Sequence, residues 1–396
     1  MSSKYANFVS YGGQISLKDA LSSTSKENRS VVVGNGFGMA LDERLGTRLF
    51  HYESLLGISG LNGTVRSLVE EFKGFETAGK ALDDSINILI KHYMSPSDSI
   101  IDEMKAHRGE LRNGLICAVN NIHERTLYEI GKENGIEDVD DDLLLNPYCF
   151  LTEFSNVFYM NYDLLAYWVF SSQNFKGVVD GFGYPDDSGF LKPSTVDQED
   201  KTLLCFPHGS LMLFGFDSDV VKVKPGPVCA GFLKKELERE NTDIARELLA
   251  CIPETVKGKK DMRLQALVKG FIACGDYPVF ISEGTSEEKE FVIAKNGYLT
   301  EVCERINELA GAVFVYGCSM ANDQHILRRI LESKADTLFI CMRDLGDEVA
   351  IADYRRYISA AQNVVKLKFK GRRSKLIVKF VDLNGFNPWC DDIKAI

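Results

Sequence analysis

Apolar runs that suit buried strands alternate with amphipathic segments along the last third of the chain. β-Branched and aromatic residues dominate the short runs, whereas the segments between them place apolar residues three and four positions apart, as helices do. Strands are expected at 278–282, 312–316, 337–342 and 376–381, and helices across 285–310, 323–333 and 347–361. Such alternation predicts a mostly parallel sheet with helices on both faces, that is, an α/β, Rossmann-like doubly wound fold.

The first half of the chain extends this plan with three more strand-like runs, at 31–33, 156–160 and 203–206. Helical periodicity covers 65–72, 78–93 and 100–130. We therefore expect a polar N-terminal arm over residues 1–29 and one domain over 30–396. A helical insertion at about 58–150 and a loop and helical insertion at about 171–270 interrupt that domain.

A glycine-rich turn follows the first of these strands. Val31 to Val33 run into Gly34-Asn35-Gly36-Phe37-Gly38, and a helix can begin at Met39. Glycine lets the backbone turn sharply and approach another group, and the free N–H groups of a helix start suit a phosphate. The spacing is G-x-G-x-G rather than the dinucleotide fingerprint, and the chain has no P-loop. By itself the pattern leaves a nucleotide turn and a tight structural turn equally open.

Three further polar tips follow predicted strands. They are Asn161-Tyr162-Asp163, His208-Gly209 and Gly317-Cys318-Ser319. Ligands bind at the carboxyl ends of strands in open parallel sheets, so these tips and the glycine turn form the candidate site. Each tip also has an ordinary alternative. Asn161 and Asp163 suit a turn and a helix cap, His208 suits a hydrogen-bonded loop, and the loop at 317–323 suits a capped strand-to-helix turn.

Composition and charge exclude several classes of protein. The net charge of −11 argues against a protein that coats nucleic acid, because such binding neutralises phosphates with basic residues. No apolar run is long enough to span a bilayer, and the polar start of the chain does not resemble a signal peptide, so a cytoplasmic protein is expected. The ten cysteines include no C-x-x-C pair, which predicts reduced, mostly buried thiols and no structural zinc site.

Two other groups of residues are assigned to packing. The five remaining histidines, His325 among them, are interpreted as surface or packing residues. Cys318 has no evident histidine partner in the sequence, which favours a small packing thiol over a nucleophile.

The order of the four motifs resembles the sirtuin family, and more closely its bacterial sirtuin-like branch, whose members consume NAD in anti-phage defence. The matching residues are Gly34-Asn35-Gly36, Asn161-Tyr162-Asp163, His208-Gly209 and Gly317-Cys318-Ser319. The chain departs from protein-deacylating sirtuins in lacking their four-cysteine zinc module. It also carries Phe37 where the family has a small residue, and Met160 where it has glutamine. Without the zinc module the acyl-lysine groove is in doubt, and NAD hydrolysis is expected.

The resemblance implies a role for each motif, with NAD as the substrate and no metal. Asn161 would hydrogen-bond a ribose hydroxyl and the attacking water, and Asp163 would accept from the nicotinamide carboxamide or fix the loop. His208, titrating near neutrality, would be the general base. The NAD-binding residues would be Gly34, Asn35, Gly36, Phe37, Gly317 and Ser319. Phe37 is further expected to shape or gate the pocket.

The leading hypothesis is therefore an NAD glycohydrolase that releases nicotinamide and ADP-ribose and depletes NAD in a bacterial anti-phage system. Because unregulated loss of NAD is toxic, we expect control by assembly, through a homo-oligomer or a partner such as a HerA-type hexameric ATPase. Two other classes stay open. One is a zinc-independent protein deacylase or ADP-ribosyltransferase, and the other is a non-catalytic module that binds NAD or ADP-ribose.

Overall fold

The computed structural model describes residues 8–51, 54, 56–57, 59–61, 63–72, 74–134, 141–173, 176–179, 182–185, 190–193, 201–216, 219–223, 278–281, 284–368 and 375–395. The helical part of the insertion expected at about 171–270, which the sequence places at 232–270, lies outside these residues. No helix in the described ranges is long and apolar enough to cross a membrane.

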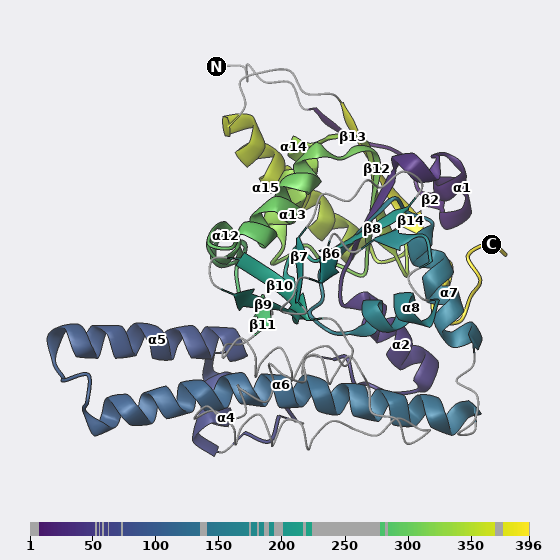
Figure 1. The fold of residues 1–396 in the computed structure, drawn as a ribbon. Coiled ribbons are helices and arrows are strands. Elements are labelled where there is room, and N and C mark those ends of the chain that lie inside the picture. The colour runs from purple at the N-terminus through teal and green to yellow at the C-terminus, as the bar shows by residue number, and fades with distance from the viewer. Residues whose placement is uncertain are drawn as a thin grey trace.

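A sheet of nine strands, all paired in parallel, runs through the centre of the described structure (Figure 1). Its order is β1 (Val9–Tyr11), β14 (Leu376–Asp382), β13 (Lys334–Met342), β12 (Ala310–Tyr316), β3 (Arg29–Val33), β4 (Asn156–Tyr159), β8 (Thr202–Cys205) and β5 (Val178–Val179), with β2 (Ile15–Ser16) also on β14. This arrangement confirms the predicted α/β, doubly wound fold.

The order of strand addition reverses between β3 and β12. The chain first places β4 and β8 on one side of β3, and later returns to place β12, β13 and β14 on its other side. In open parallel sheets such a switch point opens a crevice at the carboxyl ends of the strands, where ligands bind. The glycine turn lies at this switch point, because it directly follows β3.

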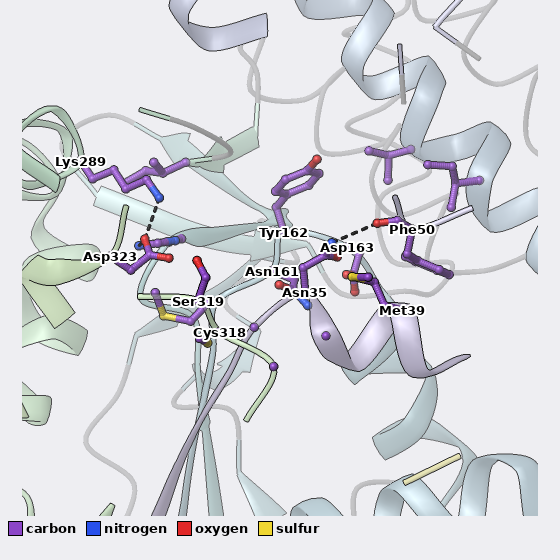
Figure 2. Close-up of a pocket in the computed structure, with 18 of the residues that line it drawn as sticks. Asn35, Met39, Phe50, Asn161, Tyr162, Asp163, Lys289, Cys318, Ser319 and Asp323 are labelled. Carbon is purple, nitrogen blue, oxygen red and sulfur yellow. Dashed lines mark hydrogen bonds and ion pairs between the residues drawn. The ribbon is translucent and has the colours of Figure 1, made fainter. Parts of the chain in front are cut away.

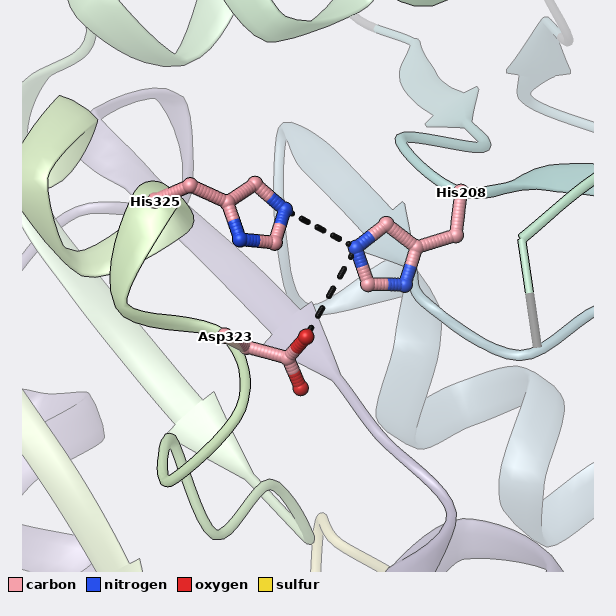
Figure 3. Close-up of side chains that lie close together, drawn as sticks. All are labelled: His208, Asp323 and His325. Carbon is pink, nitrogen blue, oxygen red and sulfur yellow. Dashed lines mark hydrogen bonds and ion pairs between the residues drawn. The ribbon is translucent and has the colours of Figure 1, made fainter. Parts of the chain in front are cut away.

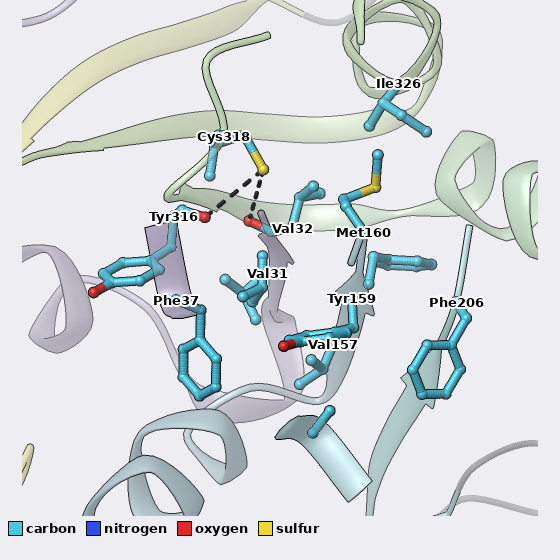
Figure 4. Close-up of a cluster of buried hydrophobic side chains, with 14 of the residues drawn as sticks. Val31, Val32, Phe37, Val157, Tyr159, Met160, Phe206, Tyr316, Cys318 and Ile326 are labelled. Carbon is cyan, nitrogen blue, oxygen red and sulfur yellow. Dashed lines mark hydrogen bonds between the residues drawn. The ribbon is translucent and has the colours of Figure 1, made fainter. Parts of the chain in front are cut away.

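Burial on both faces of the sheet explains the continuous apolar runs of the central strands. All five residues of β3 are buried, as are the last five of β12. Burial of each valine side chain contributes about 1.5–3 kcal/mol to folding. Figure 4 shows Phe37 and Tyr159 beneath the strands and Met160 with Ile326 above them, so the core continues on both faces.

Helices cover the two faces of the sheet (Figure 1). One face carries α12 (Ser286–Ala294), α13 (Gly297–Glu308), α14 (Gln324–Glu332) and α15 (Glu348–Lys368), and the other carries α2 (Gly36–Leu45), α7 (Asp141–Thr152) and α8 (Leu165–Ser172). A short helix, α1 (Leu17–Ser22), follows β2.

The predicted helical insertion forms a long helical hairpin. It consists of α4 (Gly63–Phe72), α5 (Phe75–His92) and α6 (Ser99–Asn134), with α5 packed along α6 (Figure 1). Buried residues of both long helices, Leu82 and Leu111 among them, join the main hydrophobic core. The middle of α6 thereby reaches the carboxyl ends of the central strands.

The N-terminal segment differs from the expected arm. β1 pairs with β14 in register from Val9 to Tyr11, and β2 pairs with β14 further along. The described part of residues 1–29 therefore adds two short strands to the sheet, and α1 follows them. These two strands were not predicted, because an edge strand buries only part of its surface and therefore lacks a continuous apolar run.

A second, antiparallel sheet is the main element that sequence reasoning missed. Its order is β11 (Pro278–Phe280), β9 (Gly209–Phe216), β10 (Asp219–Val223), β7 (Phe190–Pro193) and β6 (Phe182–Pro185). The strand expected at 278–282 in the parallel sheet is β11, so that placement was wrong. Gly209 allows β9 and β11 to pair. Its φ is +75°, and an added Cβ would lie 2.0 Å from the Val279 carbonyl oxygen, so only glycine permits this close approach.

Candidate active site

The four sequence motifs meet around one cavity of about 400 Å³ at the carboxyl end of the parallel sheet (Figure 2). They follow β12, β3, β4 and β8, which are adjacent in the sheet. Of the predicted site residues, those that line the cavity are Gly34, Asn35, Gly36, Asn161, Asp163, His208, Gly317 and Ser319. The volume lies within the range of small-molecule sites.

The glycine turn is closed by backbone contacts with the loop that follows β12. The N–H of Gly36 donates to the Gly317 carbonyl at 2.9 Å, and that of Phe37 donates to the Gly34 carbonyl at 3.0 Å. A Cβ on Gly36 would lie 2.5 Å from the Gly317 Cα. Glycine is therefore required here for close packing of two loops, and these two N–H groups are already used.

Phe37 does not line the cavity, contrary to the sequence prediction. Its side chain is fully buried and contacts Tyr159 (Figure 4), with ring centroids 6.0 Å apart, and Trp389, with ring centroids 4.9 Å apart. The Trp389 indole N–H also donates to the Phe37 carbonyl at 2.8 Å. The side chain leaves α2 on its core face, so Phe37 joins this helix to the C-terminal segment.

Asn161 places an unsatisfied amide at the cavity. Its Nδ2 atom is buried and makes no hydrogen bond of normal geometry, with only a weaker interaction toward the Tyr159 hydroxyl, and the residue lines the cavity near the middle of Figure 2. A buried donor without a partner costs about 1–3 kcal/mol. An acceptor on a bound ligand would remove that cost.

Asp163 fixes its own loop. One carboxylate oxygen, Oδ1, accepts from the Tyr159 hydroxyl at 2.8 Å and from the Leu165 N–H at 2.9 Å, just where α8 begins. Burial raises the pKa of Asp163, and the neighbouring His123 opposes that rise. Of its two predicted roles, the contacts support the loop-fixing one.

His208 differs from the near-neutral base that the sequence predicted. It is 3% exposed, and burial, followed by the Lys289 charge, lowers its pKa well below the usual value. Its Nε2 atom lies 3.1 Å from Nε2 of His325 and 3.7 Å from Oδ1 of Asp323 (Figure 3). His208 is therefore a neutral, hydrogen-bonded imidazole at physiological pH.

His325 was assigned to packing or the surface, but the structure brings it to the site. It is fully buried at the start of α14, its ring lies nearly parallel to that of His208 with centroids 5.2 Å apart, and burial with the His208 contact lowers its pKa to about 2. Ser286 of α12 lies 3.2 Å from its Nδ1 atom. A histidine on the apolar face of a helix that directly follows a candidate loop was the available signal.

Lys289 and Asp323 form an ion pair on the cavity wall, which sequence reasoning also missed. The Lys289 ammonium lies 2.7 Å from Oδ1 of Asp323, and Lys289 is 6% exposed (Figure 2). Of the described residues that line the cavity, Lys289 is the only lysine or arginine. It lies between glutamates in an acidic stretch, so the sequence did not mark it as a site residue.

The helical hairpin completes the cavity. Val119, Ile122 and His123 of α6 line it. His123 is a packing residue, as predicted: its Nδ1 donates to the Val119 carbonyl at 2.7 Å, and its Nε2 accepts from the Leu164 N–H at 3.1 Å. Phe50 supplies another apolar part of the wall, and its carbonyl accepts from the Asn35 side chain at 3.0 Å.

Two arrangements could suggest other chemistry. Side-chain atoms of His208, Asp323 and His325 lie within 4.8 Å of one another, a spacing compatible with metal ligation. The Lys289 ion pair and the His208–His325 contact already satisfy these groups. The Cys318 thiol is buried, which raises its pKa well above the usual value and supports the predicted packing role.

Comparison with known families gives a match over most of the chain. The model of the family described as a domain of unknown function, DUF4917, matches residues 31–241 and 256–389. The match begins in β3 and extends past β14, so it includes all four loops of the site. No curated protein matches the chain. The chain therefore belongs to the DUF4917 family.

Proposed function

We propose that this protein is an NAD glycohydrolase, which cleaves NAD to nicotinamide and ADP-ribose. One observation carries the proposal: four motifs in sirtuin-like order surround a single cavity at the switch point of a doubly wound sheet. Within it, the buried amide of Asn161 makes no hydrogen bond of normal geometry, and a ribose hydroxyl or a water would supply one.

The cavity supplies what this reaction needs. Cleavage of the nicotinamide–ribose bond passes through an oxocarbenium-like state, so the ribose must be held and water admitted to one carbon. Asn161 would bind the ribose or the water, and apolar side chains such as Phe50, Val119 and Ile122 would keep other water out.

The N–H groups of the glycine turn are not assigned to the diphosphate. The N–H groups of Gly36 and Phe37 are bonded within the protein, so they are not free for a phosphate. Lys289 and the exposed Ser319 line the same cavity and offer an ammonium and a hydroxyl. We therefore assign the phosphate contacts to these two side chains, with Gly34, Gly36 and Gly317 shaping the wall.

The test is turnover of NAD by the purified protein, with products separated by chromatography. We expect nicotinamide and ADP-ribose from the wild type, and a loss of about 100-fold or more in kcat for Asn161→Ala, the scale seen when a transition-state hydrogen-bond donor is removed. Asn322→Ala is the matched control, because its exposed side chain lies in the loop between β12 and α14 but does not line the cavity.

A wild type that binds NAD but leaves it intact, alone and together with proteins encoded by neighbouring genes, would contradict the proposal and favour a binding module. Mass spectrometry of acceptor proteins separates the transferase and deacylase alternatives, because both modify a protein and hydrolysis does not.

We extend the proposal to the biological role that the sirtuin-like resemblance implies. The enzyme would deplete NAD in anti-phage defence and be held inactive until assembly, by self-association or by a HerA-type ATPase. Light scattering after size-exclusion chromatography tests self-association. A strict monomer with full activity and no requirement for a partner would contradict this part of the proposal.

A further inference from the structure

Two carboxyl and two imidazole groups line the described wall of the cavity, on Asp163, Asp323, His123 and His208. A hydrolase needs one of them, or another base, to take the proton that the attacking water releases. Three of these groups are excluded as this base, because they already contact other groups of the protein.

Asp163 and His123 are engaged in structural hydrogen bonds. Oδ1 of Asp163 accepts from Tyr159 and from the start of α8, and both ring nitrogens of His123 are bonded to the backbone. Both side chains hold the loop at 161–163 against α6 and α8. Neither can turn toward a ligand without breaking those bonds.

His208 is excluded as the base by its contact with His325. Its Nε2 lies 3.1 Å from Nε2 of His325, so this atom hydrogen-bonds within the histidine pair whichever of the two nitrogens carries the proton. A hydrogen bond with the Met160 backbone also holds the ring. Nε2 of His208 is therefore occupied by a protein partner and is not open to a water.

Asp323 remains, and its position in the fold is unusual. It is the N-cap residue of α14, where an aspartate side chain ordinarily accepts a backbone N–H of the first turn, yet it makes no such bond. Ser286 of α12 does so instead, since its hydroxyl accepts the His325 N–H at 3.0 Å. The Asp323 carboxylate is therefore not used in the helix cap. It lines the cavity, and its side chain is 20% exposed.

Lys289 holds this carboxylate in place. Its buried ammonium contacts Oδ1 at 2.7 Å, which orients the group and keeps a cation beside it. His208 lies on the other side, 3.7 Å from the same oxygen. Lys289 of α12 and His208, which follows β8, therefore flank a carboxylate that is not needed for the helix cap; Figure 3 shows the His208 contact.

We propose that Asp323 is the catalytic residue that accepts the proton of the attacking water, an inference that rests on the proposed NAD hydrolysis. The bond between the ribose anomeric carbon and the nicotinamide nitrogen breaks, and its electron pair leaves with nicotinamide. The water oxygen forms the new bond to that carbon. One water proton passes to Asp323 and then to solvent, and ADP-ribose keeps the hydroxyl.

The experiment compares steady-state NAD hydrolysis by wild type, Asp323→Ala and Asp336→Ala, the last an exposed aspartate on β13. We expect kcat of Asp323→Ala to fall by about 10²- to 10⁴-fold, the usual worth of a general base, with a much smaller change in KM. Asp336→Ala should match the wild type. Added formate should restore part of the lost activity, because it fits the space of the removed carboxylate and can accept the same proton.

Removal of Asp323 leaves Lys289 buried without its carboxylate, which can destabilise the fold. The variant Asp323→Asn keeps a side-chain oxygen beside the Lys289 ammonium but cannot take a proton, so it should fold and remain inactive. Circular dichroism and thermal unfolding monitor the fold of each variant.

Each outcome is decisive. A folded Asp323→Ala with wild-type turnover overturns this inference and leaves the proposed function standing. A folded, inactive Asp323→Ala that formate does not restore assigns Asp323 a structural role, which also overturns it. A wild type that does not cleave NAD overturns both.

Discussion

The two ends of the cavity are built on different principles. At the switch point, Gly34, Gly36 and Gly317 bring two loops together through backbone contacts alone. At the other end, buried or half-buried polar side chains contact one another: Lys289 pairs with Asp323, and His208 contacts both Asp323 and His325. The visible sequence motif therefore provides the shape of the site, whereas much of its chemistry comes from residues outside the motifs.

Phe37→Ala should have the largest effect, and it tests whether the glycine end is structural. Removal of this fully buried ring should lower the free energy of unfolding by about 3–5 kcal/mol, the usual cost of a large cavity. The KM for NAD of the protein that remains folded should not change. Urea denaturation measures the stability and steady-state kinetics measure the KM. A changed KM with unchanged stability would support the sequence prediction that Phe37 lines the pocket.

Gly36→Ala should have the next largest effect. The added Cβ would meet the Gly317 backbone, which cannot move as a flexible side chain would, so we expect a loss of about 1–3 kcal/mol in urea denaturation. Gly13→Ala is the control, because nothing lies within 4 Å of its Cβ position. Equal stability of the two variants would show that the loops do not need their close approach.

The histidine end should respond to acid, with a smaller effect. Burial lowers the pKa of His325 to about 2, so below pH 6.5 the unfolded chain binds a proton that the folded chain does not. Stability is full above the unfolded pKa and falls as the pH drops below it. Between pH 7.5 and 5 this one histidine should remove about 2 kcal/mol.

His325→Gln removes that titration, so it should lose about 2 kcal/mol less than the wild type over the same interval. His92→Gln, an exposed histidine on α5, is the control and should follow the wild type. Urea denaturation at both pH values gives the comparison. Identical pH dependence of wild type and His325→Gln would mean that His325 is not a buried neutral group.

Sequence reasoning located the central fold well because its signals are local. Runs such as Val31 to Val33 are buried on both faces, and helices such as α14 keep one apolar face, so periodicity alone identifies them. The strand of the second sheet at β11 was misplaced for the opposite reason. A strand has no sequence mark that says which of two sheets it joins, and its partner here is β9, across a long stretch of chain.

The candidate site divides in the same way. Asn161, His208 and the glycine turn were found because each follows a strand, and strand ends in one parallel sheet must meet at one edge. Lys289, Asp323 and His325 were not found, since their roles depend on the packing of α12 against α14.

By itself the sequence determined a parallel sheet, its crossover helices and the polar tips at the ends of four strands, because these follow from periodicity and from turn chemistry. Only the tertiary structure decided how those tips are charged and which residues they contact. Burial and the neighbours on other elements lower the pKa of His208, pair Lys289 with Asp323 and turn Phe37 into the core. Charge and hydrogen bonding act across space, so residues that are distant in the chain fix the chemistry of each tip.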